Sequence, residues 1–363
     1  MVKSAAVWFM EGVSSQKDML EQVKQARAEG GYDFQLLASH RTARPEILAE
    51  ADFSYIEPAE HHDLLSFITR ICQQHNVVAI HAGKRGALLE TLRTAIEALG
   101  VKLTTGACHL DTFELADNKT LFSEKMSAAG LAAVESIQVQ MPDEVANAIS
   151  RLESQGELPC IKPVRGIYGM GFWVLKRSVK QLAFFNNPDS RQLHPDILLS
   201  SLHSALAAQE SLPLQIVMPW LPGPERSVDM LVEKGHVIAA VGRSKNGAVQ
   251  TLENSSSAFD LALACAQALE ADGLINIQTR DNAQGEPVLL EANLRPSGGI
   301  GYTAFSGINL PGLFALRQLG LIDDHETAAK TAEFQSVKVI PTHNVKPLPV
   351  AQISALHSAL SKV

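Results

Sequence analysis

The first third of the chain alternates short apolar runs with amphipathic segments. The runs predict strands at residues 5–10, 34–39, 77–81 and 101–104, with a weaker one at 53–56. Apolar residues at helical spacing predict helices at 15–29, 61–74 and 85–99, the last ending at Gly100 as its C-cap. Strands that alternate with helices in this way indicate a parallel sheet covered on both faces.

Beyond about residue 116 the pattern no longer alternates regularly, and it indicates an α+β arrangement. Apolar runs predict strands at residues 134–139, 158–164, 172–175 and 214–220, and a helix lies between the first two at 143–154. Later segments predict hairpins at 226–241 and 274–295, with helices at 257–271 and 309–319.

The hairpin at 274–295 carries the most informative residues of the chain. Because side chains alternate along a strand, Glu291, Asn293 and Arg295 share one face. Oxygen donors suit Mg²⁺, and arginine can clamp a phosphate or carboxylate. A turn symmetric about Gln284 and Gly285 would place Gln278 directly opposite Glu291. The alternative is an edge hairpin with ordinary polar residues on its outer face.

A glycine-rich turn at residues 165–171 joins a strand that ends near Lys162 to another strand. A P-loop would lead into a helix, so this is a hairpin whose backbone N–H groups can approach phosphates. Lys119 stands in the first turn of a helix that opens at Asp117, where the helix dipole disfavours a cation. It is either a solvated surface lysine or a lysine held by an anion from elsewhere, and the glycine loop is otherwise a plain hairpin.

Two other glycine motifs give weaker evidence about function. No G-x-G-x-x-G follows the first strand, which disfavours a dinucleotide-binding dehydrogenase. The sequence Gly83-Lys84-Arg85-Gly86 lacks the frame of a P-loop, and we interpret it as a turn between a strand and a helix. The start of that helix is a possible site for a substrate anion.

Composition narrows the class of protein. The 363 residues include 31 basic and 39 acidic ones, a net charge of −8, which argues against sequence-independent nucleic-acid binding. The four cysteines are scattered and suggest free thiols in a reducing cytoplasm. No run reaches the roughly 18 apolar residues of a membrane span. Glu11 ends the apolar N-terminal run too early for a signal peptide.

Taken in order, these pieces resemble the ATP-grasp superfamily, and most closely its carbamoyl-phosphate-synthetase-like and carboxylate–amine ligase branch. A weaker resemblance is to the branch found beside tellurite-resistance genes. The resemblance covers roughly residues 110–340. The matching segments are 117–119, 161–163 with the glycine loop, 222–229, 276–278 and 291–299.

The resemblance implies an α/β fold with a parallel, Rossmann-like pre-ATP-grasp domain at 1–115. An ATP-grasp fold of two α+β subdomains would follow, at 116–210 and 211–345, with a C-terminal tail at 346–363.

The resemblance also implies which residues bind the nucleotide. The two lysines would bind the phosphates of ATP, the glycine loop would close over them, and a glutamate would hold the ribose hydroxyls. The residues so implied are Lys119, Lys162, Gly166, Gly169, Gly171, Trp220, Leu221 and Glu225. The family usually has an acidic residue where this chain has Pro219, which puts the adenine contact in question.

Gln278, Glu291 and Asn293 would coordinate one or two Mg²⁺ ions, or Mn²⁺. Arg295 would hold the transferring phosphate or the substrate carboxylate, with Lys162 neutralising charge and Arg243 as a further candidate for the same work.

The activity implied is ligation in which ATP activates a carboxylate as an acyl phosphate that an amine or similar nucleophile then attacks. The alternatives are a grasp-type kinase and a non-catalytic ATP sensor. We expect small-molecule carboxylate and amine substrates, no nucleic-acid or membrane partner, and a homodimer as the default assembly. The substrates themselves cannot be read from the sequence.

Overall fold

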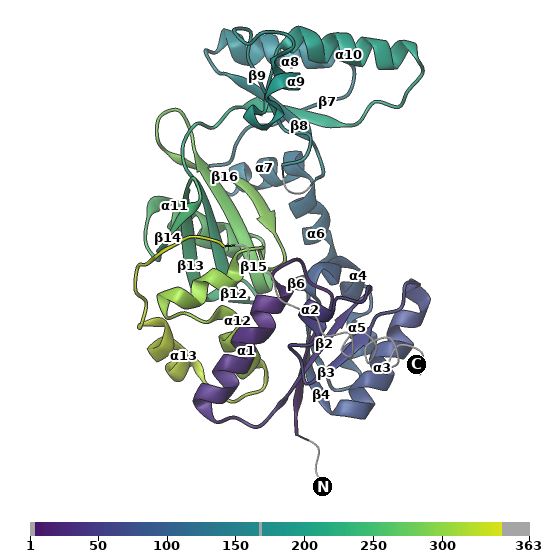
Figure 1. Cartoon of the computed structure of the whole chain (residues 1–363), viewed down its shortest axis with the longest axis vertical. Coiled ribbons are helices and arrows are strands. Elements are labelled where there is room, and N and C mark those ends of the chain that lie inside the picture. The colour runs from purple at the N-terminus through teal and green to yellow at the C-terminus, as the bar shows by residue number, and fades with distance from the viewer. Residues whose placement is uncertain (1–3, 167–168, 343–363) are drawn as a thin grey trace. The chain divides into compact units, whose positions relative to one another are not determined.

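A computed structural model describes residues 4–166 and 169–342 (Figure 1). Contacts divide the chain into two compact units: unit 1 comprises Met1–Phe113, Arg226–Gln278 and Ala292–Val363, and unit 2 comprises Glu114–Glu225 and Thr279–Glu291. The domain boundaries expected from the sequence stay a prediction, and the expected tail at 346–363 lies outside the described residues.

Unit 1 contains the parallel sheet that the sequence predicts. Its strand order is β3-β2-β1-β4-β5, and every pairing is parallel. The strands are β1 (Ala6–Phe9), β2 (Gln35–His40), β3 (Phe53–Ile56), β4 (Val77–His81) and β5 (Lys102–Thr104).

Helices cover both faces of this sheet because successive side chains of its strands point to opposite sides. Val7 and Phe9 of β1 pack with α1 and α2, whereas Trp8 packs with α3, α4 and α5. The helices are α1 (Gln16–Gly30), α2 (Pro45–Leu48), α3 (Leu64–His75), α4 (Gly86–Glu90) and α5 (Arg93–Glu97), with 3₁₀ turns η1 (His61–Asp63) and η2 (Gly83–Arg85).

The single helix expected at 85–99 is wrong, because the helix breaks between α4 and α5. Leu92 leaves helical geometry, with φ −104° and ψ 2°. The break lets the Arg93 guanidinium donate both to the Glu90 carboxylate and to the Leu103 carbonyl at the end of the sheet. Gly100 has φ 78° and closes the segment, as expected.

Most of a second, largely antiparallel sheet also belongs to unit 1, although its residues 225, 279–281 and 287–291 are in unit 2 (Figure 1). Its order is β16-β15-β12-β13-β14-β17, with the short β6 pairing to β15. The strands are β6 (Gly106–Ala107), β12 (Glu225–Glu233), β13 (His236–Asn246), β14 (Val249–Glu253), β15 (Ala271–Asp281), β16 (Pro287–Asn293) and β17 (Lys338–Val339). The helical elements are α11 (Ser257–Ala268), η4 (Ile300–Ser306), α12 (Leu310–Gln318) and α13 (Asp324–Thr331). One core joins this sheet to the α1 face of the parallel sheet through Leu231, Val241, Leu274 and Phe314.

The β15–β16 hairpin has a different turn from the one expected. The Asn282 N–H donates to the Glu286 carbonyl (2.8 Å), so the turn is centred on Gln284, and Gly285 has φ 80°. The expected pairing of Gln278 with Glu291 assumed a turn symmetric about Gln284 and Gly285 and therefore loses that basis.

Unit 2 is built on a second sheet, with strand order β10-β9-β8-β11-β7. The strands are β7 (Ile137–Val139), β8 (Pro159–Pro163), β9 (Trp173–Leu175), β10 (Gln192–Leu193) and β11 (Gln215–Pro219). The helical elements are α6 (Leu110–Asp117), α7 (Lys119–Ala128), α8 (Pro142–Ser154), α9 (Ala183–Asn186), η3 (Pro188–Ser190) and α10 (Pro195–Ala207). Helices α8 and α10 cover one face of this sheet, and the opposite face packs against Val288 and Leu290.

The N-cap expected at Asp117 is also corrected. Asp117 ends α6, and the Asn118 side chain caps α7 by accepting from the backbone N–H groups of Thr120 and Leu121.

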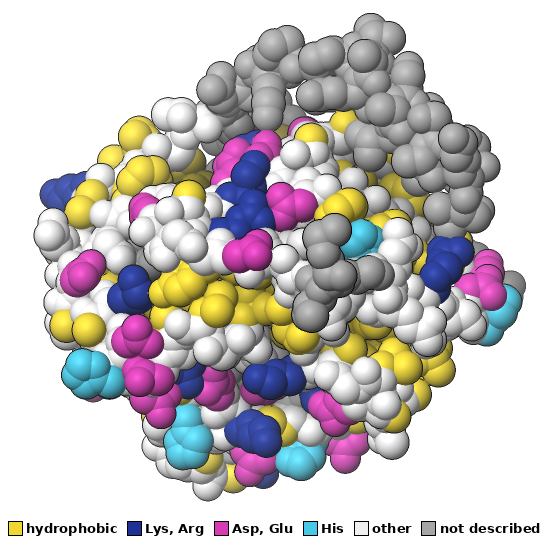
Figure 2. Space-filling model, turned by 90° about the horizontal axis from the view of Figure 1, so that it is seen from below, with side chains coloured by type: hydrophobic (Ala, Val, Ile, Leu, Met, Phe, Trp, Pro, Cys, Tyr) yellow, Lys and Arg dark blue, Asp and Glu magenta, His cyan; other side chains and the backbone are white. Residues whose placement is uncertain are grey.

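Two observations concern the surface and membrane association. On the face drawn in Figure 2, basic and acidic side chains are interspersed with no extended basic area. Among the residues with assigned structure, no helix has the length and apolar content needed to cross a membrane.

Candidate functional site

Two lysines and a glutamate of unit 2 interact electrostatically at the sheet face opposite α8 and α10. Lys162 is on β8, paired with Ile216 of β11, and by strand alternation it shares the face of Cys160 and Met218. Burial lowers the pKa of Lys162, and so does the charge of Lys119, while the charge of Glu291 raises it. The three groups are thus close enough to influence one another, and the two cations outnumber the single acid.

Lys119 is not the solvated surface lysine that was one of the two alternatives, and its contact with an anion stays a prediction. Its side chain is buried, and its Nζ donates to the Val164 carbonyl (3.1 Å), directly before the glycine loop. One hydrogen bond leaves two N–H donors on a lysine ammonium. Lys119 therefore ties the start of α7 to the base of the loop while keeping donors for an anion.

The glycine loop follows β8, as expected, and its described residues are exposed. Gly171 requires glycine for two reasons: its φ is 73°, and a Cβ there would lie 2.9 Å from the ring of Pro163. Gly169 also has a positive φ of 64°, and a Cβ on Gly166 would only touch Pro163. Residues 167 and 168 lie outside the described part of the chain, so closure of the loop stays a prediction.

The hinge segment expected to contact adenine leaves β11 at Pro219. The Trp220 N–H donates to the Leu158 carbonyl (2.7 Å), so this donor is occupied within the protein. Leu221 is buried, and Trp220 is half-buried against the same apolar cluster as Val174 and Met218. Glu225 is half-buried at the first position of β12. Trp220 and Leu221 thus belong to an apolar cluster, and the expected contacts with adenine and ribose stay a prediction.

The three residues expected to bind metal lie on the β15–β16 hairpin, all of them half-buried. Gln278 is on β15, and Glu291 and Asn293 are on β16, two positions apart and hence on one strand face. Across the described ranges, no group of three His, Cys, Asp or Glu side chains is placed to hold a metal ion. Of the three residues expected to bind metal, only Glu291 is one of these four residue types. The expected site is therefore not of the kind that this finding covers.

Arg243, expected as a catalytic candidate, is buried in a polar network of unit 1. Its Nε donates to Asp229 (2.7 Å), its Nη1 to Gln250 (2.8 Å) and its Nη2 to the Ser297 hydroxyl (2.8 Å). Asp229 also accepts from the Asn276 amide (3.0 Å), and it is fully buried. This network was not predictable from the sequence: Asp229, Asn276 and Ser297 lie in the matching segments, but Arg243 and Gln250 do not.

The network holds the segment that carries Arg295. The Ser15 hydroxyl donates to the Ser297 carbonyl (2.6 Å), and the Gly299 N–H donates to the Ser297 hydroxyl (3.1 Å). A Cβ on Gly299 would lie 2.5 Å from Arg243, so only glycine fits there. Arg295 itself is half-buried, and among the described residues its hydrogen bond is a long one (3.4 Å) to the Pro296 carbonyl. Its guanidinium therefore keeps most of its donors.

Comparisons with known proteins bear on both units. Residues 211–343 match the family model described as ATP-grasp in the biosynthetic pathway with Ter operon. A search of curated proteins returned no match.

Several solved structures share the fold across most of the chain. The L-amino acid ligase of Bacillus licheniformis is 13% identical, with a TM-score of 0.58, over 88% of this chain and 75% of its own. An N5-carboxyaminoimidazole ribonucleotide synthetase in complex with ADP is 16% identical, with a TM-score of 0.58, over 88% and 79%. The biotin carboxylase domain dimer of Hydrogenobacter thermophilus 2-oxoglutarate carboxylase, with MgADP and bicarbonate, is 14% identical, with a TM-score of 0.56, over 88% and 70%.

Proposed function

We propose that the chain is an ATP-grasp protein and that it acts as an Mg-ATP-dependent ligase that joins a carboxylate to an amine; the family match over residues 211–343 and the shared fold support this. The observation that carries the proposal is the group of Lys119, Lys162 and Glu291 in unit 2. A buried ammonium group (Lys119) and a half-buried one (Lys162), with one carboxylate within electrostatic range, favour a polyanion over a neutral ligand.

The proposed reaction has two steps. An oxygen of the substrate carboxylate attacks the γ-phosphorus of ATP, and the bond to the bridging oxygen breaks, releasing ADP and leaving an acyl phosphate. The amine nitrogen then attacks the acyl carbon, phosphate leaves, and the nitrogen loses a proton. The protein contributes positioning and charge neutralisation rather than covalent chemistry.

Each predicted residue takes a place in this scheme. Lys119 and Lys162 hold the phosphates, Arg295 holds the transferring phosphate or the substrate carboxylate, and Glu225 holds the ribose. Arg243 acts through Ser297 by fixing the segment that bears Arg295.

The donor chemistry of Gln278, Glu291 and Asn293 fits a hard divalent cation, because all three offer oxygen ligands. Bound there, Mg²⁺ would neutralise charge on the β- and γ-phosphates. Two structural neighbours bind ADP and MgADP, which supports these cofactors.

Product analysis distinguishes the ligase from its alternatives. The full-length protein is incubated with Mg-ATP and pools of carboxylates and amines, and the nucleotides and new masses are resolved. ADP and phosphate that depend on both substrates, with an amide product, are the expected result. A stable phosphorylated product would mean a kinase, and AMP with pyrophosphate would overturn the acyl-phosphate route.

Two variants control this assay. Glu291→Gln and Lys162→Ala should each abolish product formation while preserving the circular dichroism spectrum. Mg-dependent ATP binding without turnover under any pool favours the sensor, and absence of ATP binding refutes the proposal as a whole.

A further inference from the structure

A crevice of unit 1 lies at the carboxyl end of the parallel sheet, where β1 and β4 adjoin. It is lined by Met10, Gly12 and Val13 after β1, by Lys84 after β4, and by Arg295 and Pro296. The strand order reverses there, since β2 and β3 lie on one side of β1 and β4 and β5 on the other. Ligands of open α/β sheets bind outside the strand ends at such a switch point.

The interior of the crevice is uncharged. Phe9, Met19 and His81 line it, and His81 stacks on Phe9 with ring centroids 5.4 Å apart. Burial lowers the pKa of His81 to about 4, so this ring is neutral at physiological pH. The charged groups of the crevice are therefore Lys84 and Arg295, and both are cations.

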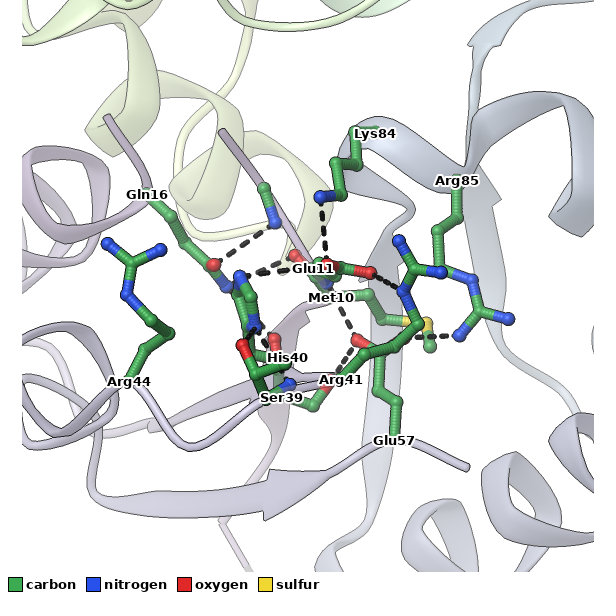
Figure 3. Close-up of polar contacts among 12 residues, drawn as sticks. Met10, Glu11, Gln16, Ser39, His40, Arg41, Arg44, Glu57, Lys84 and Arg85 are labelled. Carbon is green, nitrogen blue, oxygen red and sulfur yellow. Dashed lines mark hydrogen bonds and ion pairs between the residues drawn. The ribbon is translucent and has the colours of Figure 1, made fainter. Parts of the chain in front are cut away.

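Glu11, directly after β1, organises the cations at this edge (Figure 3). Its carboxylate accepts from Lys84 Nζ (2.9 Å) and from Arg41 Nε, and His40 Nε2 lies 3.7 Å away. Burial alone would raise the pKa of Glu11, but the hydrogen bonds from Arg41 and Lys84 outweigh it and lower this pKa. Glu11 is thus ionised and fully engaged, which leaves it no capacity for a ligand ammonium.

The exposure of these side chains shows which of them can reach a ligand. The Glu11 side chain is only 3% exposed, whereas that of Lys84 is 35% and that of Arg41 is 45% exposed. The acid therefore anchors the two cations from beneath, and their remaining N–H donors face outward.

A second buried carboxylate, that of Glu57, binds the backbone of Glu11. Glu57 accepts from the Glu11 backbone N–H (2.7 Å), from the Ser39 hydroxyl (2.8 Å) and from Arg85 Nη1 (2.6 Å), as Figure 3 shows. Arg85 Nη2 is buried, and within the described chain it has no hydrogen-bond partner. Three cations, Arg41, Lys84 and Arg85, thus face two carboxylates, and Arg295 adds a further positive charge in the crevice.

The backbone fixes Lys84 in this position. Its N–H donates to the Glu11 carbonyl (2.8 Å), and Gly83 before it has φ 62°. A Cβ on Gly83 would lie 2.2 Å from the Glu11 carbonyl oxygen, so only glycine permits the two loops to approach. The sequence suggested that the start of the helix here could bind a substrate anion. Because α4 has only five residues, we assign anion binding to side chains instead.

We propose that this crevice binds the anionic group, carboxylate or phosphate, of an organic substrate, and that it rejects ammonium groups. Lys84 and Arg295 bind the anion, and Glu11 positions Lys84 and Arg41. This inference deepens the proposed ligase function and rests on it only in taking the ligand to be a substrate.

The test is direct binding without nucleotide, so that it does not depend on the ATP site. Phenylacetate, phenyl phosphate and phenethylamine are titrated into the full-length protein by ligand-observed NMR and calorimetry. We expect saturable binding of the two anions and none of the amine. Lys84→Met should weaken anion binding about tenfold to a hundredfold, the range expected for one charge-assisted hydrogen bond.

Matched variants make the result specific. Lys84→Arg should restore most of the affinity, and Val13→Phe should block the crevice without removing charge. Lys24→Met is the control. Lys24 is a half-exposed lysine on α1 that is paired with Glu50 (3.1 Å), and it does not line the crevice.

Binding of phenethylamine, failure of both anions to bind, or equal affinity in Lys84→Met would overturn the inference. Lys162→Ala separates the two proposals, since it should weaken Mg-ATP and leave the anions unaffected. Anion binding in a protein that does not bind ATP would refute the proposed function and retain this site.

Discussion

Replacing Asp229 with alanine should destabilise unit 1 severely. Asp229 is fully buried between the Arg243 guanidinium (2.7 Å) and the Asn276 amide (3.0 Å), and Arg243 is only 3% exposed. Removing one member of a buried ion pair costs about 3–5 kcal/mol, because the other charge stays buried without compensation. A typical domain has about 5–15 kcal/mol of stability in total, so the loss is a large share of it.

The free energy of unfolding can be measured for unit 1 by urea denaturation followed through Trp8. Trp8 is buried in β1, whereas the other two tryptophans, Trp173 and Trp220, belong to unit 2 and can be replaced with phenylalanine in the reference protein. The denaturation midpoint should fall while the urea dependence stays the same, which is the signature of a change in stability alone.

A double variant tests the cause of the loss. Asp229→Ala combined with Arg243→Met removes the uncompensated charge and should be more stable than Asp229→Ala alone. As a surface control within unit 1, Glu21→Ala breaks the exposed pair with Lys17 (2.6 Å) and should change stability by no more than about 1 kcal/mol. A comparably small change in Asp229→Ala would refute the reasoning.

Three further predictions concern the proposed ATP site. Glu291→Gln should abolish Mg-dependent turnover with an unchanged circular dichroism spectrum, and a rate equal to that of the unaltered protein would dismiss the metal assignment. Because burial lowers the pKa of Lys162, its charge is lost at a lower pH than that of an ordinary lysine. The affinity for Mg-ATP, measured by calorimetry, should therefore decline as the pH rises toward 10.5, and Lys162→Arg should remove this decline. Glu225→Ala should weaken ATP more than inorganic triphosphate in competition binding, and equal losses for both would exclude a ribose role.

The elements of the fold could be predicted from the sequence where periodicity was strong. The five strands of the parallel sheet are confirmed because each is a buried apolar run, which admits few alternatives. The prediction failed at residues 85–99, where helical periodicity continues across a break that tertiary hydrogen bonds of Arg93 stabilise. It also failed at the hairpin turn. The segment from Asn282 to Glu286 is equally compatible with two or with three residues between the closing pair, and the structure has three.

The candidate site was likewise predictable from the sequence only in part. The residue types of Lys119, Lys162 and Glu291 were apparent in the sequence, but their mutual influence depends on a strand pairing that it does not display. The Glu11 cluster was missed because Glu11, His40 and Glu57 lie at or just after the ends of three different strands. Only the order of the strands in the sheet brings those strand ends together, and the one available signal was Gly83-Lys84, interpreted as a simple turn.

Buried carboxylates explain how a chain with a net charge of −8 presents sites suited to anions. Asp229 fixes Arg243, which fixes Ser297 and with it the segment that bears Arg295. Glu11 fixes Lys84 at the same crevice, and both acids are almost inaccessible to solvent. An acid beneath the surface orients a cation and leaves its outward donors to the ligand, so local potential and net charge differ in sign. The overall charge therefore argues against sequence-independent nucleic-acid binding without arguing against small anionic substrates.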